Sequence, residues 1–227
     1  MMNLNKSIDF FNPIEIKQPI HIIGVGAIGS NIADLLVRLG IDRKIHLYDF
    51  DTVDAHNITN QRYTDYDIGK EKVVALGDML QQINPSLQTV VHPEGYKKGM
   101  QLSGYVFLCV DDIDLRREIA TEHKFNPLVK AMFDFRMRLE DAQHYAANWV
   151  YMKDKEDFIN TMNFTHEEAK EATPISACGT TLSVMPTVTT ICALGVANFM
   201  QLIKENKYKK VILVDVFKYW LDALPLD

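Results

Sequence analysis

A glycine-rich loop, Gly24-Val25-Gly26-Ala27-Ile28-Gly29, follows an apolar run at residues 19–23 and opens a helical pattern at residues 28–39. This spacing is typical of a loop that binds phosphate between a strand and a helix. The first glycine permits a tight turn, the second lets a phosphate approach the backbone, and the third lets the helix pack closely on the strand. The N-terminus of the helix offers free N–H groups and a positive dipole end to an anion.

Two aspartates follow a second predicted strand at residues 45–48. Asp49 and Asp51 come directly after this strand, where acidic side chains bind the ribose hydroxyls of a nucleotide in doubly wound folds. A strand, a glycine loop, a helix, a strand and an acid in this order predict a Rossmann-like α/β fold. We expect a mostly parallel sheet with helices on both faces and mixed strands at its far edge.

The segment between residues 56 and 72 is rich in side chains that suit a triphosphate. It contains His56-Asn57-Ile58-Thr59-Asn60-Gln61-Arg62 and ends in Gly69-Lys70-Glu71-Lys72. A dehydrogenase needs an open face here for nicotinamide and substrate, whereas guanidinium and ammonium groups bind phosphate oxygens. The segment therefore favours ATP over NAD.

These motifs resemble those of the ThiF/MoeB family, the ATP-dependent activating enzymes of ubiquitin-like proteins. The family pattern combines GxGxxG, D-x-D-x-V, S-N-L-x-R-Q and a G-x-x-K that opens a helix. In this pattern Asp51 corresponds to the ribose-binding acid and Lys72 to the phosphate-binding lysine, which we also expect to act in catalysis. The loop and the resemblance together predict the following ATP-binding residues: Gly24, Gly26, Ala27, Ile28, Gly29, Asp49, Asp51, Asn57, Gln61 and Lys72.

The chain departs from the family pattern at one position. Asn60 stands where the family has the arginine before glutamine, and Arg62 follows two residues later. The loop from Asn57 to Lys72 is also one residue shorter than in the family. We expect Arg62 to supply the displaced positive charge as a catalytic residue.

A further apolar strand is predicted at residues 105–110, and it leads into Asp111-Asp112-Ile113-Asp114-Leu115-Arg116. The run resembles C-T-D-N-x-x-x-R of the same family, in which the aspartate corresponding to Asp111 binds Mg²⁺. A carboxylate at the carboxyl end of a parallel strand lies at the rim of the nucleotide crevice, and Mg²⁺ takes one or two carboxylates together with phosphate oxygens. The alternative is that Asp111 and Asp112 only cap the following helix.

The second half of the chain resembles a narrower group, the short ThiF-like proteins of phages and plasmids. Residues 133–140 match their I-D-x-R-M-x-x-E, so that Arg136 and Glu140 either line the carboxylate site or pair with each other. Cys178 precedes a long apolar helix, as a cysteine does in ThiF and MoeB. The placement implies a nucleophile that takes over the activated acyl group. The alternative is a small buried filler.

The composition is that of an ordinary globular protein, with 227 residues, 47% hydrophobic and 24% charged. We expect one domain with an ATP-binding half at residues 19–125 and a second half at residues 126–227. A net charge of −6 argues against nucleic acid as a partner. Three widely spaced cysteines without a C-x-x-C pair predict a reducing, cytoplasmic location and no structural zinc. Cys109 and Cys192 lie in apolar runs and are predicted core residues.

Residues 172–203 carry no charged side chain, over a length that could span a bilayer. Threonine, serine, proline, asparagine and glutamine interrupt this run. A buried core helix or the interface of a homodimer is therefore predicted in place of a membrane span. The remaining predicted elements are helices at 67–83 and 113–123, strands at 89–92, 128–135, 142–151 and 210–217, and a charged, mobile crossover at 153–173 with a short helix near 166–172.

The residues and the resemblance together predict an adenylyltransferase. ATP would lie across the glycine loop, with its phosphates near Lys72, Arg62 and a Mg²⁺ ion on Asp111. The carboxylate activated as acyl-AMP would be the C-terminus of a small ubiquitin-like or sulfur-carrier protein. Three alternatives remain open at this point: adenylation of a small-molecule or RNA-bound carbonyl oxygen, an NAD-dependent oxidoreductase, and a non-catalytic nucleotide-binding subunit of a heterodimer.

Overall fold

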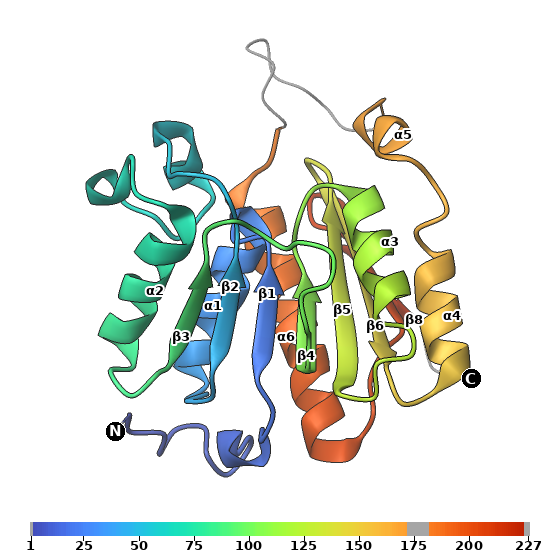
Figure 1. The fold of residues 1–227 in the computed structure, drawn as a ribbon, viewed down its shortest axis with the longest axis horizontal. Helices are drawn as coiled ribbons and strands as arrows, with labels where there is room; N and C mark the ends of the chain where they lie inside the picture. Colours follow the sequence, from blue (N-terminus) through green and yellow to red (C-terminus); the bar gives the residue numbers. More distant parts are fainter. Residues whose placement is uncertain (1, 172–181, 225–227) are drawn as a thin grey trace.

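Eight strands form one sheet in the order β3-β2-β1-β4-β5-β6-β7-β8 within the part of the chain that the computed structural model describes, residues 2–171 and 182–224 (Figure 1). The first five strands pair in parallel, whereas β6, β7 and β8 are added antiparallel. The bounds are β1 (Ile20–Ile23), β2 (Ile45–Tyr48), β3 (Thr89–His92), β4 (Gly104–Leu108), β5 (Val129–Met137), β6 (Asp141–Asn148), β7 (Val211–Asp215) and β8 (Trp220–Leu224). The predicted fold class, a mostly parallel sheet with a mixed edge, is confirmed.

Helices cover both faces of this sheet. The α-helices of the described part are α1 (Ala27–Arg38), α2 (Lys72–Ile83), α3 (Ile113–Glu122), α4 (Met152–Asn160), α5 (His166–Glu171) and α6 (Met185–Glu205). Short 3-10 turns occur at Pro13–Glu15, Ala55–Thr59 and Asp65–Asp67. Helices α1, α2 and α6 pack on one face, and α3 and α4 pack on the other (Figure 1).

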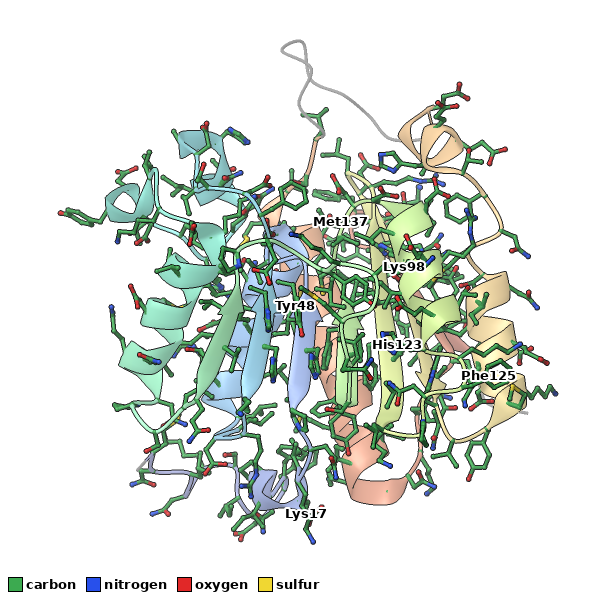
Figure 2. All side chains as sticks on the ribbon, in the orientation of Figure 1. Lys17, Tyr48, Lys98, His123, Phe125 and Met137 are labelled. Atoms are coloured by element: carbon green, nitrogen blue, oxygen red, sulfur yellow. The ribbon has the colours of Figure 1, made fainter. Side chains whose placement is uncertain are left out.

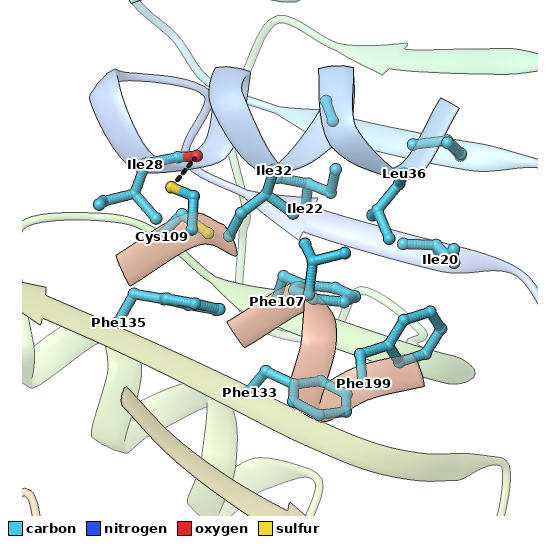
Figure 3. Packing of buried hydrophobic residues seen from close by; sticks show 14 of the residues in the cluster. Ile20, Ile22, Ile28, Ile32, Leu36, Phe107, Cys109, Phe133, Phe135 and Phe199 are labelled. Carbon is cyan, nitrogen blue, oxygen red and sulfur yellow. Dashed lines mark hydrogen bonds between the residues drawn. The ribbon is translucent and has the colours of Figure 1, made fainter. Parts of the chain in front are cut away.

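Helix α6 lies at the centre of the larger hydrophobic core. Its Phe199 contacts Phe107 of β4 and Phe133 of β5 edge-on, with ring centroids 5.5 and 5.6 Å apart (Figure 3). The helix also packs along α1. By length and apolar composition alone this helix could span a membrane. This is weak evidence, because the buried core helices of soluble proteins meet the same criterion. The charge-free run of the sequence therefore corresponds, over residues 185–203, to a core helix.

Two elements of the second half differ from the prediction. Helix α4 occupies the first part of the segment expected to be a mobile crossover, because Phe158 and Met162 pack into the core on the α3 side of the sheet. Strand β8 was not predicted, and it pairs antiparallel with β7. Both elements are short and charged or half-exposed, so their sequences alone carry little periodic signal.

Helix α2 begins at Lys72, five residues later than predicted. A 3-10 turn at Asp65–Asp67, a left-handed Gly69 with φ of 85° and a bridge between Thr52 and Glu71 take up the intervening residues. This difference matters for the site, because it places Lys72 in the first turn of a helix, beside the end of β2.

Three histidines and a tyrosine stack on the sheet face opposite α1 and α2. His21 of β1 lies 4.4 Å from His46 of β2, and His92 of β3 lies 4.1 Å from Tyr48, measured between ring centroids. Tyr48 lies on the side of the sheet that faces the viewer in Figure 2. Burial, reinforced by the neighbouring histidines, lowers the pKa of His21 to about 3 and that of His46 to about 4.

The histidine row should make the fold acid-sensitive. An unfolded histidine titrates near pH 6.5, so the lowered pKa of His21 stabilises the fold fully above that pH and less as the pH falls toward 3. We expect His21 to account for a loss of about 2 kcal/mol in the free energy of unfolding between pH 7 and pH 5. Urea titrations of wild type and His21→Phe at both pH values measure this difference.

The exposed His56 provides the control for this prediction. Among the described residues its ring bonds only to the exposed Asp54, so His56→Asn should retain the pH dependence of the wild type. An equal pH dependence in His21→Phe and wild type would contradict the assignment to His21.

Candidate nucleotide site

The glycine loop lies at the carboxyl edge of the sheet, between β1 and α1. Gly24 has φ of 86°, and a Cβ on it would lie 2.7 Å from the backbone nitrogen of Val110. A Cβ on Gly29 would lie 1.9 Å from the carbonyl oxygen of Gly24. Around Gly26, in contrast, no atom of the described residues beyond its own chain neighbours lies within 4 Å of the place of a Cβ. Two glycines thus permit close packing, and the middle one leaves open the space that a phosphate needs.

Two side chains hold this loop from outside. Asp49 accepts the Val25 N–H with one carboxylate oxygen at 2.8 Å and the Asp51 N–H with the other at 3.0 Å. The Tyr63 hydroxyl donates to the Val25 carbonyl oxygen at 2.7 Å. Burial raises the pKa of Asp49, and the two N–H groups oppose this shift. Asp49 therefore holds the loop through the Val25 N–H, and Tyr63, which the sequence did not single out, holds it through the Val25 carbonyl oxygen.

Asp51 and Lys72 lie together at the end of β2. The Lys72 ammonium donates to an Asp51 carboxylate oxygen at 2.8 Å, and the Lys72 N–H donates to the Asp51 carbonyl oxygen at 3.0 Å. The Lys72 side chain is only 7% exposed, whereas that of Asp51 is 52% exposed. An ammonium has three donors and Asp51 takes one, so Lys72 retains donors for a phosphate.

The segment that follows the second strand is ordered by polar contacts to α1. The Asn57 amide oxygen accepts the Asp54 N–H at 2.8 Å, which makes Asn57 part of a helix cap. The Arg62 N–H donates to the Ser30 hydroxyl at 3.1 Å, and its guanidinium lies 3.6 Å from an Asp34 oxygen. The predicted role of Arg62 at the triphosphate requires its side chain to turn away from Asp34, and it stays a prediction.

Several buried polar atoms of this region lack a hydrogen-bond partner among the described residues. They are Oδ1 of Asn31, Oδ1 of Asn60, Oε1 of Gln61 and Nε of Arg62. Asn31 is connected to the segment because its amide donates to the carbonyl oxygen of Asn60 at 3.2 Å. Native proteins satisfy most buried polar groups, so this cluster is typical of a place that a ligand or ordered water completes. Gln61 and Arg62 were predicted here, whereas Asn31 was not, because its helical position resembles any other on α1.

Asp111 and Asp112 have different surroundings at the end of β4. Asp112 caps α3, since its carboxylate accepts the N–H groups of Asp114 at 2.8 Å and Leu115 at 3.2 Å. Asp111 is exposed and makes no hydrogen bond or ion pair with the described residues. The capping alternative is thus correct for Asp112 only.

The donor set at Asp111 fits Mg²⁺. Among the described residues no three metal-ligating side chains converge on one point, so this part of the chain holds no all-protein metal cage. Mg²⁺ instead takes one or two carboxylates and completes its shell with substrate phosphates and water. A free carboxylate beside the glycine loop supplies the protein part of such a set.

The alternative pair of Arg136 with Glu140 does not form, whereas the cysteines predicted in the core are buried. Arg136 does not pair with Glu140; its Nε donates to an Asp134 carboxylate oxygen at 2.6 Å. Cys109 and Cys192 are buried, as predicted, and burial raises the pKa of both thiols. Cys178 lies outside the described residues.

Comparisons with known proteins agree with this geometry. The model of the ThiF family matches residues 16–219, and the chain belongs to this family. Ubiquitin-like modifier-activating enzyme 5 of Caenorhabditis elegans is 30% identical over 119 residues, in an alignment that covers 45% of this chain and 28% of that protein. The corresponding enzyme of Rattus norvegicus is 32% identical over 119 residues, 45% and 29% of the two chains. This chain thus aligns with less than a third of the length of these curated relatives.

Two solved structures share the fold. Escherichia coli MccB, crystallised with ATP, matches with a TM-score of 0.70 and 15% identity over 94% of this chain and 65% of its own. PaaA matches with a TM-score of 0.68 and 14% identity over the same shares. At this identity the likeness is one of fold.

Proposed function

We propose that this chain is an ATP-dependent adenylyltransferase that activates a carboxylate as acyl-AMP. One observation carries the proposal: Gly24 packs against the backbone of Val110, so that the phosphate loop and the Asp111 carboxylate lie at one edge of the sheet. The Asp51–Lys72 pair lies at the same edge, at the end of β2.

In this proposal, the residues at this edge of the sheet bind different parts of ATP. The loop N–H groups and the N-terminus of α1 bind a phosphate, and Asp51 accepts the ribose hydroxyls. Lys72 and Arg62 stabilise charge on the triphosphate. Asp111 would hold Mg²⁺, which when bound neutralises phosphate charge.

The reaction then needs no covalent bond to the protein. A carboxylate oxygen of the substrate attacks the α-phosphorus, the bond from that phosphorus to the α,β-bridging oxygen breaks, and pyrophosphate leaves. Positioning of the carboxylate and stabilisation of phosphate charge account for the rate. The neutralising groups named above are therefore the ones whose loss should reduce it.

The substrate we propose is the C-terminus of a small ubiquitin-like or sulfur-carrier protein. The curated relatives named above are activating enzymes of ubiquitin-like modifiers, and MccB has been crystallised with N-formylated MccA. We also retain the homodimer as part of this proposal. Before its last turn, the exposed positions of α6, among them Ala193 and Ala197, carry no charge and would suit a partner surface.

Ligand-induced stabilisation separates this proposal from the oxidoreductase alternative. Mg-ATP at about 100 times its Kd should stabilise the fold by about 2.7 kcal/mol. NAD should not stabilise it, because NAD lacks the triphosphate that Lys72 and Arg62 would bind. Thermal melts with Mg-ATP, ATP with EDTA, and NAD measure the difference. A rise in Tm with NAD and none with Mg-ATP would overturn the proposal.

A further inference from the structure

One fully buried carboxylate lies between two arginines behind the candidate site. Asp134 of β5 has no exposed surface. Nη1 of Arg116 donates to its Oδ1 at 2.5 Å, and Nε of Arg136 donates to its Oδ2 at 2.6 Å. A buried ion pair of this kind is seldom more stabilising than apolar side chains of similar volume, so its presence calls for a role besides stability.

Arg116 connects this carboxylate to the residue before Asp111. Its Nε donates to the Val110 carbonyl oxygen at 2.8 Å, and its Nη2 donates to the same oxygen. Its Nη1 also reaches the Phe135 carbonyl oxygen at 2.5 Å. The planar guanidinium thus fixes the backbone at the end of β4, whereas no hydrogen bond or ion pair from the described residues holds the Asp111 side chain itself.

Arg136 connects the same carboxylate to the crossover. Its Nη1 and Nη2 donate to the carbonyl oxygen and hydroxyl of Thr161, at 2.7 and 2.8 Å, just after α4. Its guanidinium lies 4.3 Å from the centre of the Tyr145 ring. Through the two arginines, Asp134 therefore links the backbone of Val110 to Thr161, the residue that follows α4.

We propose that Arg116, held in place by Asp134, is a positioning residue that orients Asp111 toward the metal-bound triphosphate. This inference rests on the proposed function. A lysine would keep the positive charge beside Asp134, but a single ammonium cannot hold the Val110 oxygen, the Phe135 oxygen and the carboxylate in the planar geometry of a guanidinium. Arg116→Lys should therefore loosen the backbone next to Asp111 and displace its carboxylate.

Arg117→Lys is a matched control. Arg117 is the next residue of α3 and donates to the carbonyl oxygens of Met162 at 2.9 Å and Phe164 at 3.2 Å. Among the described residues it thus bonds to the segment after α4, and it makes no hydrogen bond or ion pair with Asp134 or Val110. A general weakening of this region should affect both variants, whereas loss of the position of Asp111 should affect Arg116→Lys alone.

Two measurements on the full chain test the proposal. In nucleotide-free protein, hydrogen exchange of amides 109–112 should be at least about tenfold faster in Arg116→Lys than in wild type or Arg117→Lys. The Mg²⁺ concentration that gives half of the Mg²⁺-dependent gain in ATP affinity should be at least about tenfold higher in Arg116→Lys than in wild type. The Kd for ATP measured in EDTA should stay within about twofold of the wild-type value.

The outcomes separate this inference from the proposed function. Wild-type exchange and wild-type Mg²⁺ dependence in a folded Arg116→Lys would overturn the positioning role, and so would equal changes in Arg117→Lys. If wild type does not bind Mg-ATP, the proposed function fails, and equal exchange of amides 109–112 in all three proteins would then also show that Arg116 does not fix the backbone before Asp111. A change in urea midpoint without a change in either readout would mean that Arg116 is only structural.

Discussion

Lys72→Ala should lower carboxylate-dependent exchange of pyrophosphate into ATP by at least about 100-fold, the loss typical when one preorganised stabiliser of transition-state charge is removed. The Lys72 ammonium is almost fully buried at the end of β2, and its carboxylate partner among the described residues is Asp51. Its loss removes positive charge from the proposed phosphate site, and Asp51 remains half-exposed to water. The fold should therefore persist, which a urea titration checks alongside the exchange assay.

Lys70→Ala is the control for this experiment. Lys70 lies two residues away, is about half exposed and pairs with Asp67 outside the site. It should keep exchange within about twofold of wild type, since exposed ion pairs contribute little. Full exchange in Lys72→Ala would exclude this lysine from the phosphate site.

Gly29→Ala should reduce the free energy of unfolding by about 2–3 kcal/mol, at the upper end of the usual cost of overpacking. Its Cβ would lie 1.9 Å from the Gly24 carbonyl oxygen, which is backbone and cannot turn aside. Helix α1 or the glycine loop must shift, so binding of Mg-ATP should weaken as well. Urea titration and ATP binding measure the two effects.

Gly77→Ala is a matched helical glycine with the opposite expected result. The nearest side-chain atom to its Cβ would be the Thr89 hydroxyl at 3.5 Å, an ordinary contact. Alanine in a helix should then stabilise the fold by about 0.5–1 kcal/mol. If Gly29→Ala is as stable as wild type and binds ATP equally well, the close packing of α1 on the loop is not needed for the site.

The first half of the fold could be predicted from the sequence because its signals are local. The strand, glycine loop and helix at residues 19–39 follow one another without interruption, and the structure places them as β1 and α1. The acidic residues after β2 and β4 also follow from strand ends, since parallel strands end at one edge. What the sequence did not show was the division of roles, with Asp49 bracing the loop and Asp51 facing Lys72.

Other contacts join residues that lie far apart in the sequence or in different elements. A pair with Glu140 was one of two alternatives for Arg136, but its partner is Asp134, whose other oxygen accepts from Arg116 of helix α3, 18 residues earlier in the sequence. Tyr63 likewise reaches the glycine loop across 38 residues of sequence. Such partners have no fixed spacing, so no pattern in a single sequence identifies them.

Carboxylate-dependent pyrophosphate exchange by the wild-type chain tests the central claim most directly. The probe is a small β-grasp protein that ends in Gly-Gly, and the control is the same protein with an amidated C-terminus. We predict that label from pyrophosphate enters ATP only when ATP, Mg²⁺ and the free carboxylate are all present. Acyl-AMP forms only from these components, and its reaction with labelled pyrophosphate then returns labelled ATP. Exchange that is equal with the amidated control, or no exchange at saturating Mg-ATP and probe, would contradict the account.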